Sequence, residues 1–187
     1  LAAFYNQNLL KDAYSQDHFQ RTLTEKLPDY QSSFEEQARN YNHDWELLVA
    51  MGYQESHLDA NAVSPTGVRG LMMLTNNTAK AMGVSDRVDP YQSIGGGARY
   101  LEQVKADFSD VPKTDRIWFA LAGYNMGPNA VKRIQRELRA QGIDDKSWAN
   151  VYAYLADNRA SNSRYGQAMH YVSNIRSYLE TIKTQTV

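Results

Sequence analysis

Residues 51–57 read Met51-Gly52-Tyr53-Gln54-Glu55-Ser56-His57 and place one carboxylate at the end of an apolar helical run. Counting back from Glu55, Gly52 lies three residues away, Met51 four and Leu48 seven, and these spacings share one face of an α-helix. The Glu55 side chain therefore lies on the same face of the helix as its core residues. Because burial penalises the charged form of a carboxyl group, this residue is either a structural liability or a catalytic group with a raised pKa.

The composition is that of an ordinary globular chain. Its 187 residues suffice for one domain with a sizeable core or for a domain with an appendage, and no apolar run reaches membrane-spanning length. The formal net charge is −1 and no segment concentrates Lys and Arg, so neither a nucleic-acid partner nor an anionic membrane surface has electrostatic support. The absence of Cys excludes disulfides, thiolate catalysis and Cys-ligated metals. Thirteen Tyr and three Trp fit either aromatic packing or the flat apolar platforms of a carbohydrate site.

The chain shows helical spacing and no convincing alternating strand pattern, so we expect a mostly α fold. Residues 1–40 should form peripheral helices or a tether, with Pro28 in the first turn of the second helix. Helix starts at Asp44, Thr75, Asp89 and Asp115, together with later start and stop signals, then predict helices at about 45–56, from 75 to 83, and at about 90–108, 115–127, 129–141, 148–155 and 165–182. The run Gly95-Gly96-Gly97 lacks the spacing and the preceding strand of a phosphate loop and indicates close helix packing.

Four short stretches stand out, and they follow one another along the chain in this order: Glu55-Ser56, Gly70-Leu71-Met72, Tyr124-Asn125 and Tyr171-Val172. Each alone is a weak signal. The Glu stands at a helix end, a Pro-Gly turn separates the first two stretches, and Tyr-Asn follows an Ala-rich helix. Together they resemble the lytic transglycosylases with the soluble-transglycosylase type of lysozyme-like domain. The resemblance covers about Asn40 to Ile182 and implies a lysozyme-like (goose-type/transglycosylase) helical domain, residues 41–187, with a substrate cleft.

This resemblance implies an enzyme that cleaves the β-1,4 bond between N-acetylmuramic acid and N-acetylglucosamine in peptidoglycan with one essential Glu, which Glu55 matches. An acid for this step must stay protonated near neutral pH, and an apolar surround can raise a Glu pKa to about 6–7. After cleavage the same carboxylate would take a proton from the C6 hydroxyl of the muramic acid and close a 1,6-anhydro ring. Asp59, the nearest acidic residue in sequence, reads as a loop or capping residue, so we expect no second carboxylate beside Glu55.

The same match assigns the substrate-binding residues of the cleft. They are Ser56, Gly70, Leu71, Met72, Met73, Tyr124, Asn125 and Tyr171. Ser56 would hydrogen-bond near the acid or the substrate, the backbone around Gly70 to Met72 would form the floor, and Tyr124 and Asn125 would line the cleft. Tyr171 would reach the carboxylate and fix its orientation. Taken singly, each could be an ordinary helix-end, cap or core residue.

Five residues, in three of the motif regions, depart from the pattern of many relatives. Met73 stands where a Gln is common, Thr75 where a later Met is common, and Gln167-Ala168 where the last motif often begins with Glu-Thr. Gly123 replaces the common Ala before Tyr-Asn. We expect these differences to affect substrate subsites, while the acid is retained.

The residues leave two other functions open, a hydrolytic muramidase on the same scaffold and a non-catalytic peptidoglycan-binding module. No metal or other cofactor is expected, because His18, His43, His57 and His170 include no pair with the helical spacing of metal ligands. The partner implied by the resemblance is the peptidoglycan glycan strand. The chain opens on Leu1 without an initiator Met, so we expect a fragment of a longer protein. Its similarity to membrane-bound members of the family implies a periplasmic, outer-membrane-associated protein with an N-terminal solute-binding-like regulatory domain outside this chain.

Overall fold

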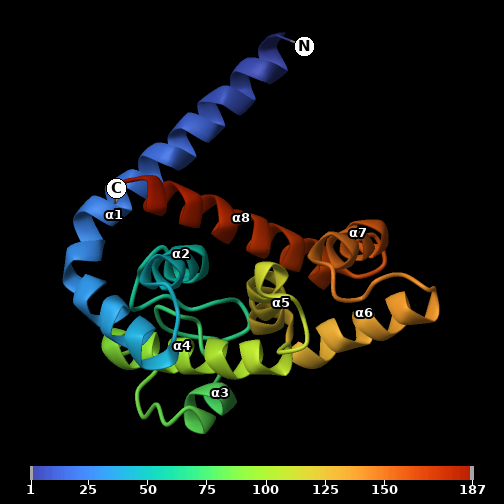
Figure 1. Ribbon diagram of the computed structural model, residues 1–187. Helices are drawn as coiled ribbons and strands as arrows, with labels where there is room; N and C mark the ends of the chain where they lie inside the picture. The colour runs from blue at the N-terminus through green and yellow to red at the C-terminus, as the bar shows by residue number, and fades with distance from the viewer. Residues whose placement is uncertain (1, 186–187) are drawn as a thin grey trace.

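Helices make up the structure, a computed structural model that describes the backbone of residues 2–185 and the side chains of residues 15–185. They are α1 (Ala2–Tyr41), α2 (Trp45–Ser56), α3 (Asn76–Ala81), α4 (Pro90–Asp107), α5 (Lys113–Met126), α6 (Pro128–Ala140), α7 (Trp148–Asn158) and α8 (Ser163–Gln185) (Figure 1). The only strand-like pairing over this range is a pair of isolated bridges from Arg69 to Val63 and to Leu74. The prediction of a mostly α fold is confirmed.

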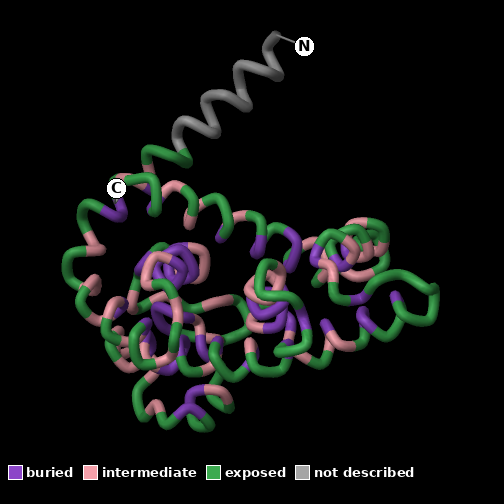
Figure 2. Tube along the Cα trace, viewed as in Figure 1, coloured by how far each residue is buried: buried purple, intermediate pink, exposed green. Residues whose placement is uncertain are grey.

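Helix α2 lies at the centre of the fold. Every residue from Leu47 to Tyr53 is buried, so the helix is apolar around its whole circumference and needs cover on all sides. Helices α1, α4 and α8 contact it and supply that cover. Figure 2 shows buried residues concentrated in α2 and α5, between the long helices α4 and α8. The apolar run that ends at Glu55 is therefore the centre of the core rather than one face of a surface helix.

Helix α1 runs unbroken through Pro28, so the prediction that a new helix begins there is wrong. Pro28 cannot donate a backbone hydrogen bond to the turn before it, and such a residue bends a helix. Figure 1 shows α1 curving round α2 and reaching α4. Phe19 and Leu23 before the proline, and Phe34 and Ala38 after it, are all buried in the core. Packing on both sides of Pro28 keeps the helix continuous despite the missing bond, and from Phe19 onward the helix belongs to the core.

Two of the predicted helix caps are present as side-chain hydrogen bonds. The Thr75 hydroxyl accepts from the backbone N–H of Thr78 at 3.0 Å and begins α3. The Asp89 carboxylate accepts from the N–H groups of Tyr91 at 2.9 Å and Gln92 at 3.3 Å and begins α4, with Pro90 in the first turn. These starts are local, which is why the sequence predicts them.

Two acidic residues expected at helix starts use their carboxylates for tertiary contacts rather than for capping, although Asp44 does stand at the N-cap position of α2 as predicted. Asp44 precedes α2 but makes no side-chain cap, and its carboxylate forms an ion pair with Lys183 of α8 at 2.8 Å. Helix α5 begins at Lys113, before Asp115. The Asp115 carboxylate accepts a hydrogen bond from the backbone N–H of Trp148 at 2.8 Å and so joins α5 to the start of α7.

The glycines of α4 allow close packing, as expected. A Cβ at Gly97 would lie 2.8 Å from the Cβ of Met72, and one at Gly96 would lie 2.5 Å from Cγ2 of Val84. Helix α4 can therefore approach Met72 and Val84 closely only because these positions lack side chains. None of the described helices combines the length and apolarity needed to cross a bilayer.

We expect Gly97→Ala to destabilise the protein by roughly 1–3 kcal/mol, because the added methyl group overlaps Met72 in a filled core. Gly95→Ala is the matched control. Its Cβ would meet only the end of the Gln37 side chain at 3.4 Å, so replacing glycine inside the same helix should stabilise by about 0.5–1 kcal/mol. Urea unfolding of both variants measures the difference, and equal effects would contradict the packing described.

Candidate active site

Glu55 lies in the last turn of α2, at a helix end that is firmly fixed. His57 (φ 53) and Leu58 (φ 58) adopt the left-handed conformation and turn the chain away from the helix axis. The His57 N–H donates to the carbonyl of Tyr53 at 2.8 Å, which closes the last turn. Leu58 is buried and holds the reversal against the core. The position of the Glu55 carboxyl group is therefore set by the backbone as well as by its own packing.

The Glu55 carboxyl group has a strongly shifted acidity. Burial raises its pKa from 4.5 to about 7, because desolvation disfavours the charged form. The hydroxyl of Tyr171 opposes this shift as a hydrogen-bond donor and holds the pKa below the value that burial alone would give. Among the described residues this buried hydroxyl has no partner in ordinary hydrogen-bond geometry, so its interaction with Glu55 is weaker than a well-formed hydrogen bond. A free carboxyl at such a site can donate and recover a proton near neutral pH.

The pKa values of Tyr124 and Tyr171 are also shifted, in part by Glu55. Burial raises the pKa of both phenols well above the usual value, and the charge of Glu55 raises each of them further. The structure therefore brings together three of the predicted site residues, which come from α2, α5 and α8. Both phenols therefore remain protonated at neutral pH.

Three hydroxyl groups hold the predicted floor of the cleft. Ser56 donates to the carbonyl of Leu71 at 2.7 Å, and Tyr124 donates to the carbonyl of Met72 at 2.9 Å. The backbone N–H of Met72 donates to the buried hydroxyl of Ser93 at 3.0 Å. Leu71 and Met72 are fully buried, so this segment contributes fixed backbone beneath the cleft rather than exposed side chains. Sequence reasoning missed Ser93, which carries no local signal because its contact spans 21 residues.

The segment from Gly70 to Leu74, which includes the floor of the cleft, has a backbone conformation that restricts which residues can occupy it. Gly70 has φ +90, and a Cβ there would lie 2.0 Å from the carbonyl oxygen of Arg87. Met73 also has positive φ, at 50. The guanidinium of Arg87 donates to the carbonyl of Leu74 at 2.9 Å and closes the end of the segment. The predicted glycine is thus required by a close backbone approach.

Two adjoining hollows meet at Asn125. An open cleft of about 590 Å³ beside the acid is lined by Gln54, Glu55, Pro65, Asn125, Gln167, His170 and Tyr171. A smaller one of about 280 Å³ has Met73, Tyr124, Asn125 and Arg164 in its lining. Of the predicted residues, Glu55, Asn125 and Tyr171 line the first hollow and Met73, Tyr124 and Asn125 the second. Gly70, Leu71 and Met72 lie buried beneath them, and Ser56 holds that floor.

Four further residues line the cleft, of which only Gln167 was expected to affect a substrate subsite. Gln167 lies four residues before Tyr171 on α8 and three before His170, and both spacings place side chains on the same face of the helix. This spacing was the available signal. Gln54 precedes the acid and Pro65 belongs to the turn before the floor segment.

Glu55 is the one carboxylate that lines these two hollows, as far as the described residues go. Asp59 is exposed, and its carboxylate accepts from the backbone N–H of Asn61 at 2.9 Å. The interpretation of Asp59 as a loop residue is confirmed. The arrangement supports chemistry that needs a single acid and base of neutral pKa.

Comparisons with known proteins agree on one family. The family model of the transglycosylase SLT domain matches residues 32–154. Membrane-bound lytic murein transglycosylase F of Stutzerimonas stutzeri is 43% identical over 174 residues, which cover 88% of this chain and 36% of that protein. Its namesake from Shewanella pealeana is 44% identical with the same coverage. The predicted resemblance is confirmed, and the chain spans 36% of the length of these relatives.

Solved structures show the same fold. An inactive mutant of the lytic transglycosylase Slt from Pseudomonas aeruginosa aligns with a TM-score of 0.60 at 23% identity, over 80% of this chain and 23% of that one. The 70 kDa soluble lytic transglycosylase of Escherichia coli aligns with a TM-score of 0.57 at 21% identity, with the same coverage. The predicted lysozyme-like helical fold class is confirmed.

We expect Glu55→Gln to stabilise the protein at high pH only. Between pH 4.5 and about 7 the folded protein keeps a proton that the unfolded chain has released, so wild-type stability falls as pH rises through this window. Gln has no charge to bury and escapes this loss. Above pH 7 the variant should be more stable by roughly 1–2 kcal/mol, less than the full shift implies because Glu55 keeps partial contact with solvent.

Thermal unfolding at pH 4 and pH 8 measures the effect. The control is Glu102→Gln, an exposed residue of α4, which should leave the pH dependence unchanged. If Glu55→Gln gave the same stability difference at both pH values, the raised pKa would be refuted.

Proposed function

The chain belongs to the transglycosylase SLT family, and from that membership we propose that it is the catalytic module of a lytic murein transglycosylase. Its substrate would be the peptidoglycan glycan strand, and it would cleave the β-1,4 bond between N-acetylmuramic acid and N-acetylglucosamine. The observation that carries the proposal is Glu55, a carboxyl group with a pKa of about 7 at the wall of an open cleft. The names of the relatives support the same activity.

In the proposed mechanism Glu55 acts first as an acid. Its proton passes to the glycosidic oxygen, and the bond from that oxygen to C1 of the muramic acid breaks. Positive charge then develops at C1, and the N-acetyl group of the same sugar would stabilise it. A pKa near 7 suits this step, because a large fraction of the carboxyl groups is protonated at neutral pH and the proton is readily given up.

Glu55 then acts as a base. The carboxylate takes the proton of the C6 hydroxyl, O6 bonds to C1, and the product is 1,6-anhydro-N-acetylmuramic acid. The acid is regenerated and no water is consumed. Enzymes that hydrolyse glycosides ordinarily place a second carboxylate across the bond, and Glu55 has none beside it among the residues described.

The neighbours of Glu55 would position the acid and the sugars. Tyr171 would orient the carboxyl group, and their hydrogen bond would become well formed when substrate displaces water. Asn125 lies where the two hollows meet and so could contact sugars on both sides of the scissile bond. Gln54 and Gln167 add side-chain amides that can both donate and accept hydrogen bonds.

The setting of the activity is part of the proposal. The relatives are named membrane-bound and extend well beyond the region that this chain matches. We therefore place the module in the bacterial periplasm, as part of a longer polypeptide that associates with the outer membrane and carries an N-terminal solute-binding-like regulatory domain. Residues 1–40 would lead from that domain into the module, with α1 joining its core from Phe19 onward, and residues 41–187 would carry the catalysis.

Product analysis of digested sacculi tests the reaction. Wild-type protein should release muropeptides that end in the 1,6-anhydro sugar, and Glu55→Gln should release them more slowly by roughly 10²–10⁴-fold, since it cannot transfer the proton. Mass spectrometry of the soluble products distinguishes the outcomes. Reducing ends, one water heavier, would show a hydrolytic muramidase. Equal lysis by both proteins would refute the role of Glu55, and no lysis by wild type would indicate a non-catalytic binding module.

The pH dependence tests the role of Tyr171. Because its hydroxyl lowers the pKa of Glu55, Tyr171→Phe should raise that pKa and move the alkaline limb of kcat/KM to higher pH. Tyr178→Phe is the matched control, because Tyr178 lies two turns further along α8 and packs against Phe19 and Tyr53. An unchanged alkaline limb in Tyr171→Phe would show that Tyr171 does not interact with the acid.

A further inference from the structure

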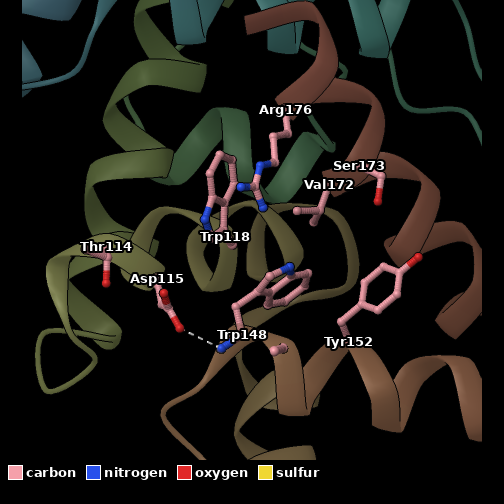
Figure 3. Close-up of a pocket in the computed structure, with 9 residues that line it drawn as sticks. Thr114, Asp115, Trp118, Trp148, Tyr152, Val172, Ser173 and Arg176 are labelled. Atoms are coloured by element: carbon pink, nitrogen blue, oxygen red, sulfur yellow. Dashed lines mark hydrogen bonds between the residues drawn. The ribbon is translucent and has the colours of Figure 1, made fainter. Parts of the chain in front are cut away.

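A third hollow, of about 610 Å³, lies between α5, α7 and α8 (Figure 3). Helix α8 separates it from the cleft that contains Glu55. Gln167, His170 and Tyr171 of α8 line the cleft, whereas Ser173 and Arg176 line the third hollow. Nothing in the proposed mechanism uses this hollow.

Aromatic rings form much of its wall. Trp118 comes from α5, and Trp148 and Tyr152 come from successive turns of α7. The rings of Trp148 and Tyr152 meet edge to face, with centroids 6.4 Å apart. Tyr152 is 38% exposed, one of the few large apolar side chains that the described surface leaves open to solvent. The hollow thus combines a solvent-accessible ring with two indoles behind it.

Polar groups converge on the same space. The guanidinium of Arg176 lies over the ring of Trp118 at 4.9 Å from its centroid, and its ion pair with exposed Glu180 is loose at 3.8 Å. Figure 3 shows the indole nitrogen of Trp148 facing the space between Arg176 and Tyr152, and no described residue accepts a hydrogen bond from it. Both groups are donors, so the hollow offers fixed donors beside apolar rings.

We propose that this hollow is a second glycan-binding site, which holds an N-acetylated sugar of the peptidoglycan outside the catalytic cleft. The inference rests on the proposed function. Sugar rings present C–H faces that pack on aromatic side chains, and their N-acetyl carbonyls and hydroxyls accept hydrogen bonds from Arg176 and from the indole of Trp148. The positive charge of Arg176 also suits a polymer that carries carboxylates. The volume lies in the range of known ligand sites.

A second site on the other side of α8 has a physical consequence for a polymeric substrate. A strand held in this hollow keeps neighbouring glycan close to the cleft, which raises its effective concentration there without any new contact to Glu55. The benefit applies to sacculi, whose strands are linked, and not to short fragments that fill one site.

The three tryptophans of the chain supply the test. Glu55→Gln protein, which should not turn over, is labelled with ¹⁵N and titrated with chitotetraose while the three indole N–H signals are followed by NMR. The signals of Trp118 and Trp148 should shift and saturate, whereas that of Trp45, which does not line the hollow, should not move. Adding Tyr152→Ala should weaken this binding by roughly tenfold, and Tyr152→Phe, which keeps the ring, should preserve it.

Retention on sacculi gives a second readout. Glu55→Gln protein should pellet with purified sacculi, and the further change Tyr152→Ala should reduce the retained fraction several-fold. Unmoved Trp118 and Trp148 signals, with shifts confined to the side-chain amides of Asn125 and Gln167 in the cleft, would overturn the second site and leave the proposed function standing. Absence of any shift would also overturn it, whereas the proposed function fails only on the products released from sacculi.

Discussion

The helix that carries Glu55 is covered on every side, and the rest of the fold follows from this constraint. A helix that is apolar around its circumference can be stable only inside a shell of other helices, which α1, α4 and α8 provide. The last turn of α2 reaches the surface beside Tyr171 of α8. The same burial that stabilises the core therefore withdraws the Glu55 carboxyl group from water and raises its pKa.

The surroundings of the acid are held by hydrogen bonds that do not depend on a substrate. Ser56, Ser93 and Tyr124 fix the backbone of Leu71 and Met72 from three different helices. A site whose polar groups are already oriented need not reorganise as charge develops during a reaction, which is the main physical advantage of a preformed cleft. The floor and the acid are thus parts of one packed unit.

The sequence predicts features that depend on local chemistry and misses those that depend on packing. Caps and helical spacing predict that Glu55 stands at a helix end. The order of the motifs predicts the family to which the chain belongs. Pro28 was expected to begin a helix, because the sequence does not show that buried residues on both sides would hold α1 together. Asp115 was also expected to begin a helix, although its carboxylate instead accepts a hydrogen bond from the backbone N–H of Trp148. Ser93 has no local signal at all, since its partner lies 21 residues away.

Both steps of the proposed chemistry depend on the acidity of Glu55. A ¹³C NMR titration of the Glu55 side-chain carboxyl group in the folded protein measures this acidity without reference to substrate or product. The structure predicts a midpoint near pH 7. A midpoint near pH 4.5, the ordinary value for this side chain, would mean that the carboxyl group is charged at neutral pH and would contradict its role as the acid.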